Sequence, residues 1–284
     1  SPHGQGTATT FAQMTADMLG VTPADVQVLH SDTDILPAGG GTGASRGMIA
    51  GGSSLQWVLE DAHGKLTAIA AHLLSCSQED VVLQEGLAFS QQNPQTAVPF
   101  ARLAEAAHTE ELLPPGQEPG LDFKGSTTLR KSPYAFGAHM AVVEVSRETG
   151  TIKILKYLAV HDSGTIINPV LAEGQVHGAV AQGIGQALFE GMAYSPEGQP
   201  LSGSLMDYAL PRSDNMPDFI LDTLETPSPL TAFGVKGIGE LPTLAAPVAV
   251  VNAVMDALSQ TGVRNIDAPL SPEKVWRALH EDTP

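Results

Sequence analysis

Apolar residues in the first hundred positions recur first at helical and then at strand spacing. Phe11, Met14 and Met18 lie three to four residues apart, which predicts a helix that Gly20 ends. A longer helical pattern runs from residue 55 to residue 73, with Ser45 as a candidate N-cap of this region. We further expect a short strand at 26–28, a loop at 30–43, a hairpin at 81–89 and a short helix at 100–108.

The second half of the chain mixes the same two patterns. Alternating apolar residues between 142 and 158 flank Glu148-Thr149-Gly150, which predicts a β-hairpin. A long helix rich in small residues begins at Pro169, a strand is expected at 220–224, and helices at 246–258 and 275–279. Because helices and strands interleave, the sequence predicts an α+β (mixed α/β) fold.

A Pro/Gly-rich segment at 113–120 is the best candidate for an internal linker. We therefore expect one α/β segment at 1–115 and a second at 116–284. The sequence starts Ser1-Pro2-His3, directly before Gly4-Gln5-Gly6, without an initiator methionine or the features of a signal peptide. This start is typical of a processed piece, a subclone or a fragment of a larger catalytic unit.

Composition and charge exclude several classes of function. Among 284 residues, 31 Asp and Glu stand against 14 Lys and Arg, for a formal net charge of −17. This balance argues against a nucleic-acid groove or an anionic membrane surface as partner, since both need clustered basic residues. No apolar run approaches the ~20 residues of a membrane-spanning helix. The single cysteine, Cys76, rules out an internal disulfide, a zinc site made only of cysteines and a cysteine-ligated iron–sulfur cluster within this chain.

Glycines are concentrated in four clusters, at 4–6, 39–52, 174–185 and 234–239. Glycine lets a backbone approach a ligand closely, and helix N-termini offer free N–H groups, so the clusters suit a large phosphorylated cofactor. For any single cluster, however, turns, helix ends and close helix packing are the favoured explanation. The phosphate-binding P-loop motif is absent, and the spacing at 234–239 does not fit the dinucleotide fingerprint. Glu240 follows the last cluster and is either a helix cap or a functional carboxylate.

Several blocks in order resemble the molybdenum hydroxylases, which include xanthine dehydrogenases, aldehyde oxidases and the large subunits of carbon monoxide dehydrogenases. The resemblance runs from residue 1 to about residue 280. The residues within the blocks are most similar to those of the carbon monoxide dehydrogenase branch. Thr7 is a departure, because that branch often has histidine there. The blocks are Gly4-Gln5-Gly6 with Thr10 and Gln13, Asp32-Thr33, Gly41-Thr42-Gly43-Ala44-Ser45-Arg46, Gly51-Gly52, His161-Asp162-Ser163-Gly164, Ile167-Asn168-Pro169, Glu173-Gly174-Gln175, Gln182-Gly183, Asp207-Tyr208 and Gly237-Ile238-Gly239-Glu240.

The resemblance implies a fold, a cofactor and partners. The chain would be the C-terminal lobe of a molybdenum-cofactor-binding domain, holding molybdenum–molybdopterin in its cytosine dinucleotide form. The dithiolene of the cofactor would hold the metal, so no protein ligand to molybdenum is expected. An N-terminal lobe, an FAD subunit and a [2Fe–2S] subunit would be partners in a cytoplasmic hetero-oligomer. The complex would hydroxylate an electron-poor carbon of a small molecule (an aldehyde, an N-heterocycle or carbon monoxide), with water as the oxygen source.

The same resemblance assigns roles to individual residues. Glu240 matches the active-site glutamate, the general base that removes a proton from the molybdenum-bound hydroxyl. Gln5 would lie near the pterin and the oxo ligand, with Gly6 and Thr7 in the same loop. The other expected contacts are the pyrophosphate for Thr42, Gly43, Ala44, Ser45 and Arg46, the nucleotide end for Asp162 and Thr165, and the pterin or its phosphate for Gln175, Lys236 and Gly237.

Two other functions stay open at this point. A non-catalytic relative would keep the fold and subunit contacts without the cofactor, although the intact Glu240, Gln5 and Gln175 argue against it. An unrelated glycine-rich nucleotide-binding module would account for the glycines but not for the ordered blocks. The isolated histidines are expected to be surface or packing residues, whereas His161, next to Asp162, could support the site. These isolated histidines are His30, His63, His72, His108, His139 and His177.

Overall fold

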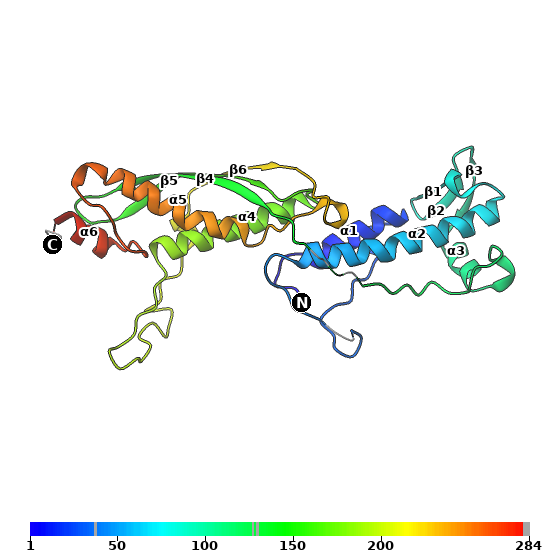
Figure 1. Ribbon diagram of the computed structural model, residues 1–284, viewed down its shortest axis with the longest axis horizontal. Helices are drawn as coiled ribbons and strands as arrows, with labels where there is room; N and C mark the ends of the chain where they lie inside the picture. The colour runs from blue at the N-terminus through cyan, green and yellow to red at the C-terminus, as the bar shows by residue number, and fades with distance from the viewer. Residues whose placement is uncertain (37–38, 127, 129–130, 281–284) are drawn as a thin grey trace. The chain divides into compact units, whose positions relative to one another are not determined.

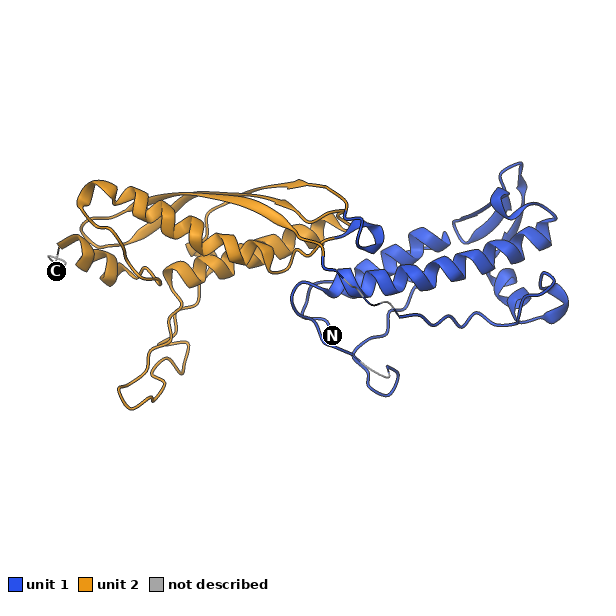
Figure 2. Cartoon of the chain, viewed as in Figure 1, with its two compact units in different colours: residues 1–132, 228–235 blue, residues 133–227, 236–284 orange. Residues whose placement is uncertain are grey.

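The computed structural model describes residues 1–36, 39–126, 128 and 131–280, and it divides the chain into two compact units. The first unit comprises residues 1–132 and 228–235, and the second comprises residues 133–227 and 236–284 (Figure 2). The chain thus leaves the second unit after Pro227 and returns to it at Lys236. Each unit has its own hydrophobic core and is described separately below.

The first unit combines three helices with a small antiparallel sheet. The helices are α1 (Thr7–Leu19), α2 (Ser53–Leu74) and α3 (Phe100–Ala107). The strands β1 (Val81–Gln84), β2 (Leu87–Ser90) and β3 (Asn93–Pro99) pair in the order β1-β2-β3 (Figure 1). A π-helical turn, Gly47–Gly52, leads directly into α2. The sheet, α2 and α3 enclose a core that includes Leu66, Ile69, Ala88, Leu103 and Ala106.

The segment at 113–120, expected as a linker, is folded onto this first unit. Leu113 is buried in the core, and the Gly120 N–H donates a hydrogen bond to the Ala107 carbonyl at 2.7 Å. The Lys65 ammonium donates to the Glu118 carbonyl at 2.7 Å. The division between the two units falls after residue 132. The assignment of 1–115 and 116–284 to separate segments of a lobe stays a prediction.

The second unit is a three-stranded sheet covered by helices on one face. Strands β4 (Phe136–Val145) and β5 (Ile152–Asp162) form the expected antiparallel hairpin, and β6 (Phe219–Leu224) runs parallel to β5. The sheet order is β4-β5-β6, so β5 is central. Helices α4 (Pro169–Leu188) and α5 (Leu241–Ala257) pack beneath the sheet (Figure 1). Helix α6 (Pro272–His280), near the C-terminus of the chain, packs against the same core.

Helices α4 and α5 approach so closely that one glycine of the third cluster is required for packing. A Cβ atom added to Gly183 would lie 2.6 Å from the Ala246 Cβ and 2.9 Å from the Pro247 Cδ. On the same helix, a Cβ added to Gly174 or Gly178 would meet nothing within 4 Å. Close helix packing, rather than contact with a cofactor, therefore explains why residue 183 is a glycine.

Most of the expected elements are confirmed, and four differ. Residues 26–28 form no strand, because a three-residue run finds no pairing partner. Ser45 is not an N-cap: its φ is 52°, and the helical segment begins at Gly47 after Arg46. Strand β3 was not expected, since its sequence NPQTAVP is polar and contains two prolines. Helix α5 begins at Leu241, five residues before its expected start, with Pro242 in its first turn.

The contact at Gly183 predicts opposite effects for alanine at two positions of α4. We expect Gly183→Ala to lower the unfolding free energy of the second unit by about 1–3 kcal/mol, because the added methyl overpacks the α4–α5 contact. Gly178→Ala, the matched control, should raise it by up to about 1 kcal/mol through helix propensity. Denaturant unfolding followed by Trp276 fluorescence, with Trp57 replaced by Phe, measures the second unit. Equal effects of the two variants would contradict the packing argument.

Candidate functional site

In the first unit, the segment Gly4–Thr7 forms the entry to helix α1. Gly4 and Gly6 have φ values of 90° and 73°, in the left-handed region that favours glycine. Gly6 is the N-cap residue, and no side chain caps the first N–H groups of α1, which begins at Thr7. The Gln5 side-chain oxygen accepts a hydrogen bond from the His3 N–H. The segment therefore presents a helix N-terminus with backbone donors.

The Gly41–Arg46 loop has a strained backbone. Ala44 and Ser45 both have a φ of 52°, a region that non-glycine residues adopt at a cost of about 1–3 kcal/mol. The Arg46 N–H and Nε both donate to the Gly43 carbonyl, at 3.2 and 3.3 Å. The Thr42 hydroxyl donates to the Ser1 carbonyl, which joins this loop to the N-terminal segment. Two of the segments predicted to bind the cofactor are thus neighbours in the first unit.

In the second unit, the carboxylate of Asp162 lies at the end of β5 with no solvent exposure. It accepts hydrogen bonds from the Gly164 N–H at 2.9 Å, from the Thr226 N–H at 3.3 Å and from the Thr226 hydroxyl. The Lys236 ammonium completes the set at 3.0 Å. We call Asp162, Gly164, Thr226 and Lys236 the Asp162 corner. It joins the end of β5 to residues that lie 64 and 74 positions further along the chain.

Lys236 is held in this corner from several sides. Its side chain is 9% exposed, and its ammonium also donates to the Thr226 hydroxyl at 2.7 Å. Its backbone N–H donates to the Ser163 carbonyl at 2.8 Å, and its ammonium lies 5.2 Å from the centre of the Phe136 ring. Burial alone would raise the pKa of Asp162, but the hydrogen bonds from Thr226, Gly164 and Lys236 lower it to about 2. Asp162 is therefore a permanent anion at neutral pH.

The remaining predicted residues of the second unit lie around its helix starts. Glu240 directly precedes α5, its side chain is exposed, and it makes no capping hydrogen bond to that helix. This observation does not support the interpretation of Glu240 as a helix cap. Gln175 lies in the second turn of α4 and is partly buried, as is Thr165 in the segment before α4. Gly237 connects Lys236 to the segment that ends at Glu240.

Sequence reasoning missed a hydrogen-bonded chain of three side chains on the inner face of the sheet. His139 Nδ1 lies 2.6 Å from the Tyr157 hydroxyl, and His139 Nε2 lies 2.7 Å from His161 Nε2. Burial, and secondarily the charge of His161, lower the pKa of His139 to about 4, and burial raises the pKa of Tyr157. His139 is thus partly buried and packed against Tyr157 and His161, in keeping with the expectation of a surface or packing residue, but its hydrogen bonds were not foreseen. The signal was the strand alternation, which places all three on the same face as Ala141 and Ala159.

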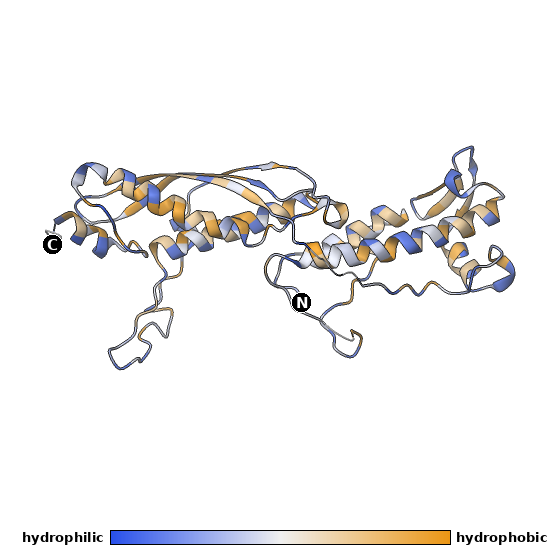
Figure 3. Cartoon of the chain, viewed as in Figure 1, coloured by the Kyte–Doolittle hydropathy of each residue, from blue (hydrophilic) through white to orange (hydrophobic). Residues whose placement is uncertain are grey.

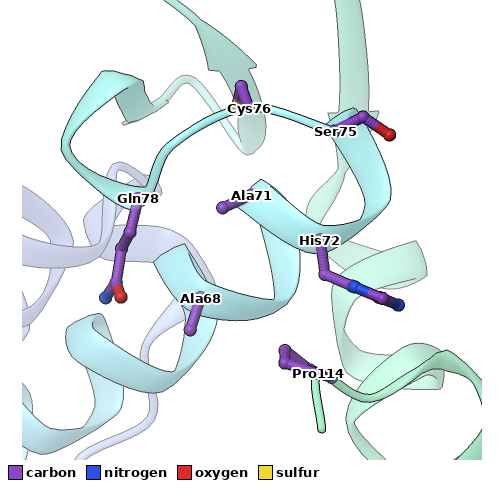
Figure 4. Close-up of a pocket in the computed structure, with 7 residues that line it drawn as sticks. All are labelled: Ala68, Ala71, His72, Ser75, Cys76, Gln78 and Pro114. Carbon is purple, nitrogen blue, oxygen red and sulfur yellow. The ribbon is translucent and has the colours of Figure 1, made fainter.

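Two pockets lie outside the residues predicted to bind the cofactor. A cavity of about 250 Å³ in the second unit is bordered by His161, the start of α4 and β6. A pocket of about 490 Å³ in the first unit lies at the C-terminal end of α2 and is lined by Ala68, Ala71, His72, Ser75, Cys76, Gln78 and Pro114 (Figure 4). This pocket is remote from the Gly41–Arg46 loop, which precedes the other end of the 22-residue helix, about 33 Å away along its axis. Burial raises the pKa of the Cys76 thiol, which makes it a poor nucleophile.

The described residues contain no group of three or more His, Cys, Asp or Glu side chains placed to hold a metal ion. Within the same residues, no helix is both long and apolar enough to cross a bilayer. The predicted site residues form two sets, one in each unit. Gln5 to Thr7 and Thr42 to Arg46 belong to the first, and Asp162, Thr165, Gln175, Lys236, Gly237 and Glu240 belong to the second.

Comparison with known proteins gives a consistent result. Residues 1–217 match the family model of the molybdopterin cofactor-binding domain. The chain is 40% identical over 277 residues to the nicotine 6-hydroxylase large subunit of Paenarthrobacter nicotinovorans, covering 97% of this chain and 34% of that protein. It is 34% identical over 280 residues to the carbon monoxide dehydrogenase large chain of Hydrogenophaga pseudoflava, covering 98% and 34%.

A solved structure agrees with these relatives. Quinoline 2-oxidoreductase from Pseudomonas putida 86 superposes with a TM-score of 0.89 at 37% identity, covering all of this chain and 36% of that one. The chain thus spans about a third of the length of the relatives it matches. The mixed α/β fold expected from the sequence is confirmed.

The buried ion pair predicts a large effect of removing its cation. Lys236→Met leaves the Asp162 carboxylate buried without a counter-charge, so we expect a loss of about 3–5 kcal/mol in unfolding free energy of the second unit. Arg277→Met, the control, removes an exposed pair with Glu273 and should cost less than about 1 kcal/mol. The double variant Asp162→Asn/Lys236→Met should recover part of the loss. Similar unfolding midpoints for both single variants would refute this account.

The histidine pair predicts a loss of stability in mild acid. The pKa of His139 is lower in the folded state than its ordinary value of 6.5, so the unfolded chain takes up more protons as the pH falls from 6.5 to 4. The unfolding free energy should therefore fall by about 3 kcal/mol across this window, at about 1.4 kcal/mol per pKa unit. The contribution of Asp162, whose pKa is about 2, is lost only below pH 4.

Denaturant unfolding at a series of pH values between 7.5 and 4 measures this effect. His139→Gln should flatten the dependence, whereas His280→Gln, which changes an exposed histidine of the same unit, should leave it intact. An unchanged slope in His139→Gln would show that the pair does not control acid stability.

Proposed function

We infer the function of this chain from its family: it belongs to the molybdopterin cofactor-binding domain family of molybdenum hydroxylase large subunits. We propose that it holds molybdenum–molybdopterin in the cytosine dinucleotide form and hydroxylates an electron-poor carbon. The observation that carries this proposal is the position of Glu240. Its exposed carboxylate lies at the N-cap position of α5, directly after a glycine-rich segment.

The residues present fit a phosphate-bearing cofactor. The backbone of the Gly41–Arg46 loop is open, since a Cβ at Gly41 or Gly43 would meet nothing within 4 Å. Thr42, Ser45 and Arg46 place two hydroxyls and a guanidinium on the same short loop. In the second unit, the buried Ser163 hydroxyl has no hydrogen-bond partner among the described residues. Such donors suit an anion held largely by neutral groups.

We assign the contacts as follows. Gln5, Gly6 and Thr7 face the pterin and the metal from the N-terminus of α1, and the 42–46 loop holds the pyrophosphate. Thr165 contacts the nucleotide end, and the buried Asp162 serves that end by holding Lys236 and the Gly164 N–H in place. Gln175, Lys236 and Gly237 contact the pterin or its phosphate, with Lys236 kept in place by the Asp162 corner.

Glu240 acts as the general base in this proposal. When bound, the cofactor supplies oxygen transfer from water to carbon and accepts two electrons. The substrate gains a hydroxyl in place of a hydrogen, and two protons are released. Glu240 takes up one of them through its carboxylate, which is exposed at the start of α5.

The partners follow from the length of the relatives. The rest of the large subunit, which supplies the other lobe, would complete the cofactor site, and FAD and [2Fe–2S] subunits would carry the electrons away. An N-heterocycle is the favoured substrate class, because the relatives at 40% and 37% identity are named for nicotine and quinoline. A relative without catalysis is disfavoured by the intact Glu240.

The base assignment is tested by Glu240→Gln in the assembled enzyme. Glutamine keeps the size of the side chain but cannot accept a proton, and general-base assistance is worth roughly 10²–10⁴ in rate. We expect full molybdenum content and reduction by substrate at least ~100-fold slower, measured by metal analysis and stopped-flow spectroscopy. Glu148→Gln, at the exposed β4–β5 turn, is the control and should leave both values unchanged. A Glu240→Gln enzyme with full molybdenum content and a near-normal rate of reduction by substrate would refute the proposal.

A further inference from the structure

The sheet of the second unit has one face that no described residue of this unit covers. Helices α4 and α5 pack on the inner face, against side chains such as Tyr157 and Ala159 (Figure 1). The opposite face carries five apolar side chains, each 40–54% exposed. We call these residues the outer face: Phe136, Met140, Val142, Ile220 and Leu224.

The strand register places these side chains next to one another across the sheet. Met140, Leu158 and Ile220 occupy one row over β4, β5 and β6. Neighbouring strands lie about 4.8 Å apart, so such a row is continuous. A sheet with one solvated face normally alternates apolar residues inward and polar residues outward. Here many outward positions are apolar as well. Figure 3 shows the mixture of hydrophobic and hydrophilic residues along the strands, without distinguishing their two faces.

The outer face reaches the Asp162 corner. After an intervening row of Ala138, Val160 and Asp222, the residues Phe136, Asp162 and Leu224 form the row at the end of β5. The Lys236 ammonium lies 5.2 Å from the centre of the Phe136 ring. The apolar surface therefore adjoins residues that we assign to cofactor binding, and whatever completes the cofactor site there has to meet this surface.

We propose that the outer face packs against the part of the large subunit that this chain lacks, a proposal that rests on the function given above. The relatives are nearly three times as long as this chain, so most of their polypeptide is available to cover it. A largely apolar surface of this kind, even with Lys156 and Asp222 on the same face, is typical of permanent contacts rather than of transient ones with electron-transfer subunits. A second copy of this chain would bury the surface without completing the cofactor site.

Oxidation of methionines by hydrogen peroxide, followed by peptide mass spectrometry, tests the proposal. In the 284-residue chain alone, Met140 should oxidise at a rate near that of Met206, which is 93% exposed. Met14, which is 3% exposed, sets the protected limit. In the assembled large subunit without its redox subunits, the Met140 rate should fall at least ~10-fold, towards that of Met14.

A pair of lysine variants tests the same surface by assembly. Ile220→Lys should reduce the yield of assembled large subunit at least ~10-fold, because a buried ammonium would lack a partner. Val170→Lys changes a residue on α4 that is 80% exposed and lies off the outer face, and it should assemble normally. Circular dichroism of both variants in the 284-residue chain checks that each folds.

Three outcomes would overturn the proposal. These are Met140 oxidation at equal rates in the chain and in the large subunit, protection in the chain alone with self-association, and protection only after the redox subunits bind. Molybdenum content separates this proposal from the proposed function. A large subunit that protects Met140 but holds no molybdenum supports the docking surface and refutes cofactor binding, whereas an unprotected Met140 with full molybdenum does the reverse.

Discussion

The second unit depends on one buried carboxylate. Asp162 ends the central strand of the sheet and has no contact with solvent, so its charge has to be balanced by the protein. Thr226, which follows β6, and Lys236, which leads towards α5, supply the balance. Lys236 is fixed in this way. The segment of four residues that connects it to the start of α5, ending at Glu240, therefore begins at a fixed position. The position of Glu240 is therefore a consequence of the charge at Asp162.

Local sequence patterns predicted most of this fold because the elements have clear periods and clear ends. The β4–β5 hairpin, α4 and β6 were all expected from apolar spacing and turn residues, and all are present. Two of the failures share a cause. The 26–28 run has the alternation of a strand but no partner, whereas β3 lacks the alternation and is held by pairing with β2. In both places long-range pairing decided the outcome.

The residues of the candidate site were found by resemblance, but their arrangement was not predictable from spacing. Asp162 and Lys236 are 74 positions apart, and Thr226, which bonds to both, belongs to none of the recognised blocks. The glycine clusters illustrate the same limit. Gly183 serves the contact between α4 and α5, whereas Gly41 serves a left-handed turn, and the sequence alone treats them alike. Only the surroundings of each backbone separate the two uses.

Electrostatics shapes how such a chain can hold an anionic cofactor. The net charge is −17, so the overall field disfavours phosphate. Lys236, one of the two basic residues assigned to the site, is already paired with Asp162, and the Nε of Arg46, the other, already donates to a backbone carbonyl. Backbone N–H groups and hydroxyls must therefore provide much of the binding, and they do so only when the backbone is held in position. The strained Ala44-Ser45 turn and the unpartnered Ser163 hydroxyl have this character, which is why the glycine-rich segments, rather than the charged side chains, carry the cofactor in this proposal.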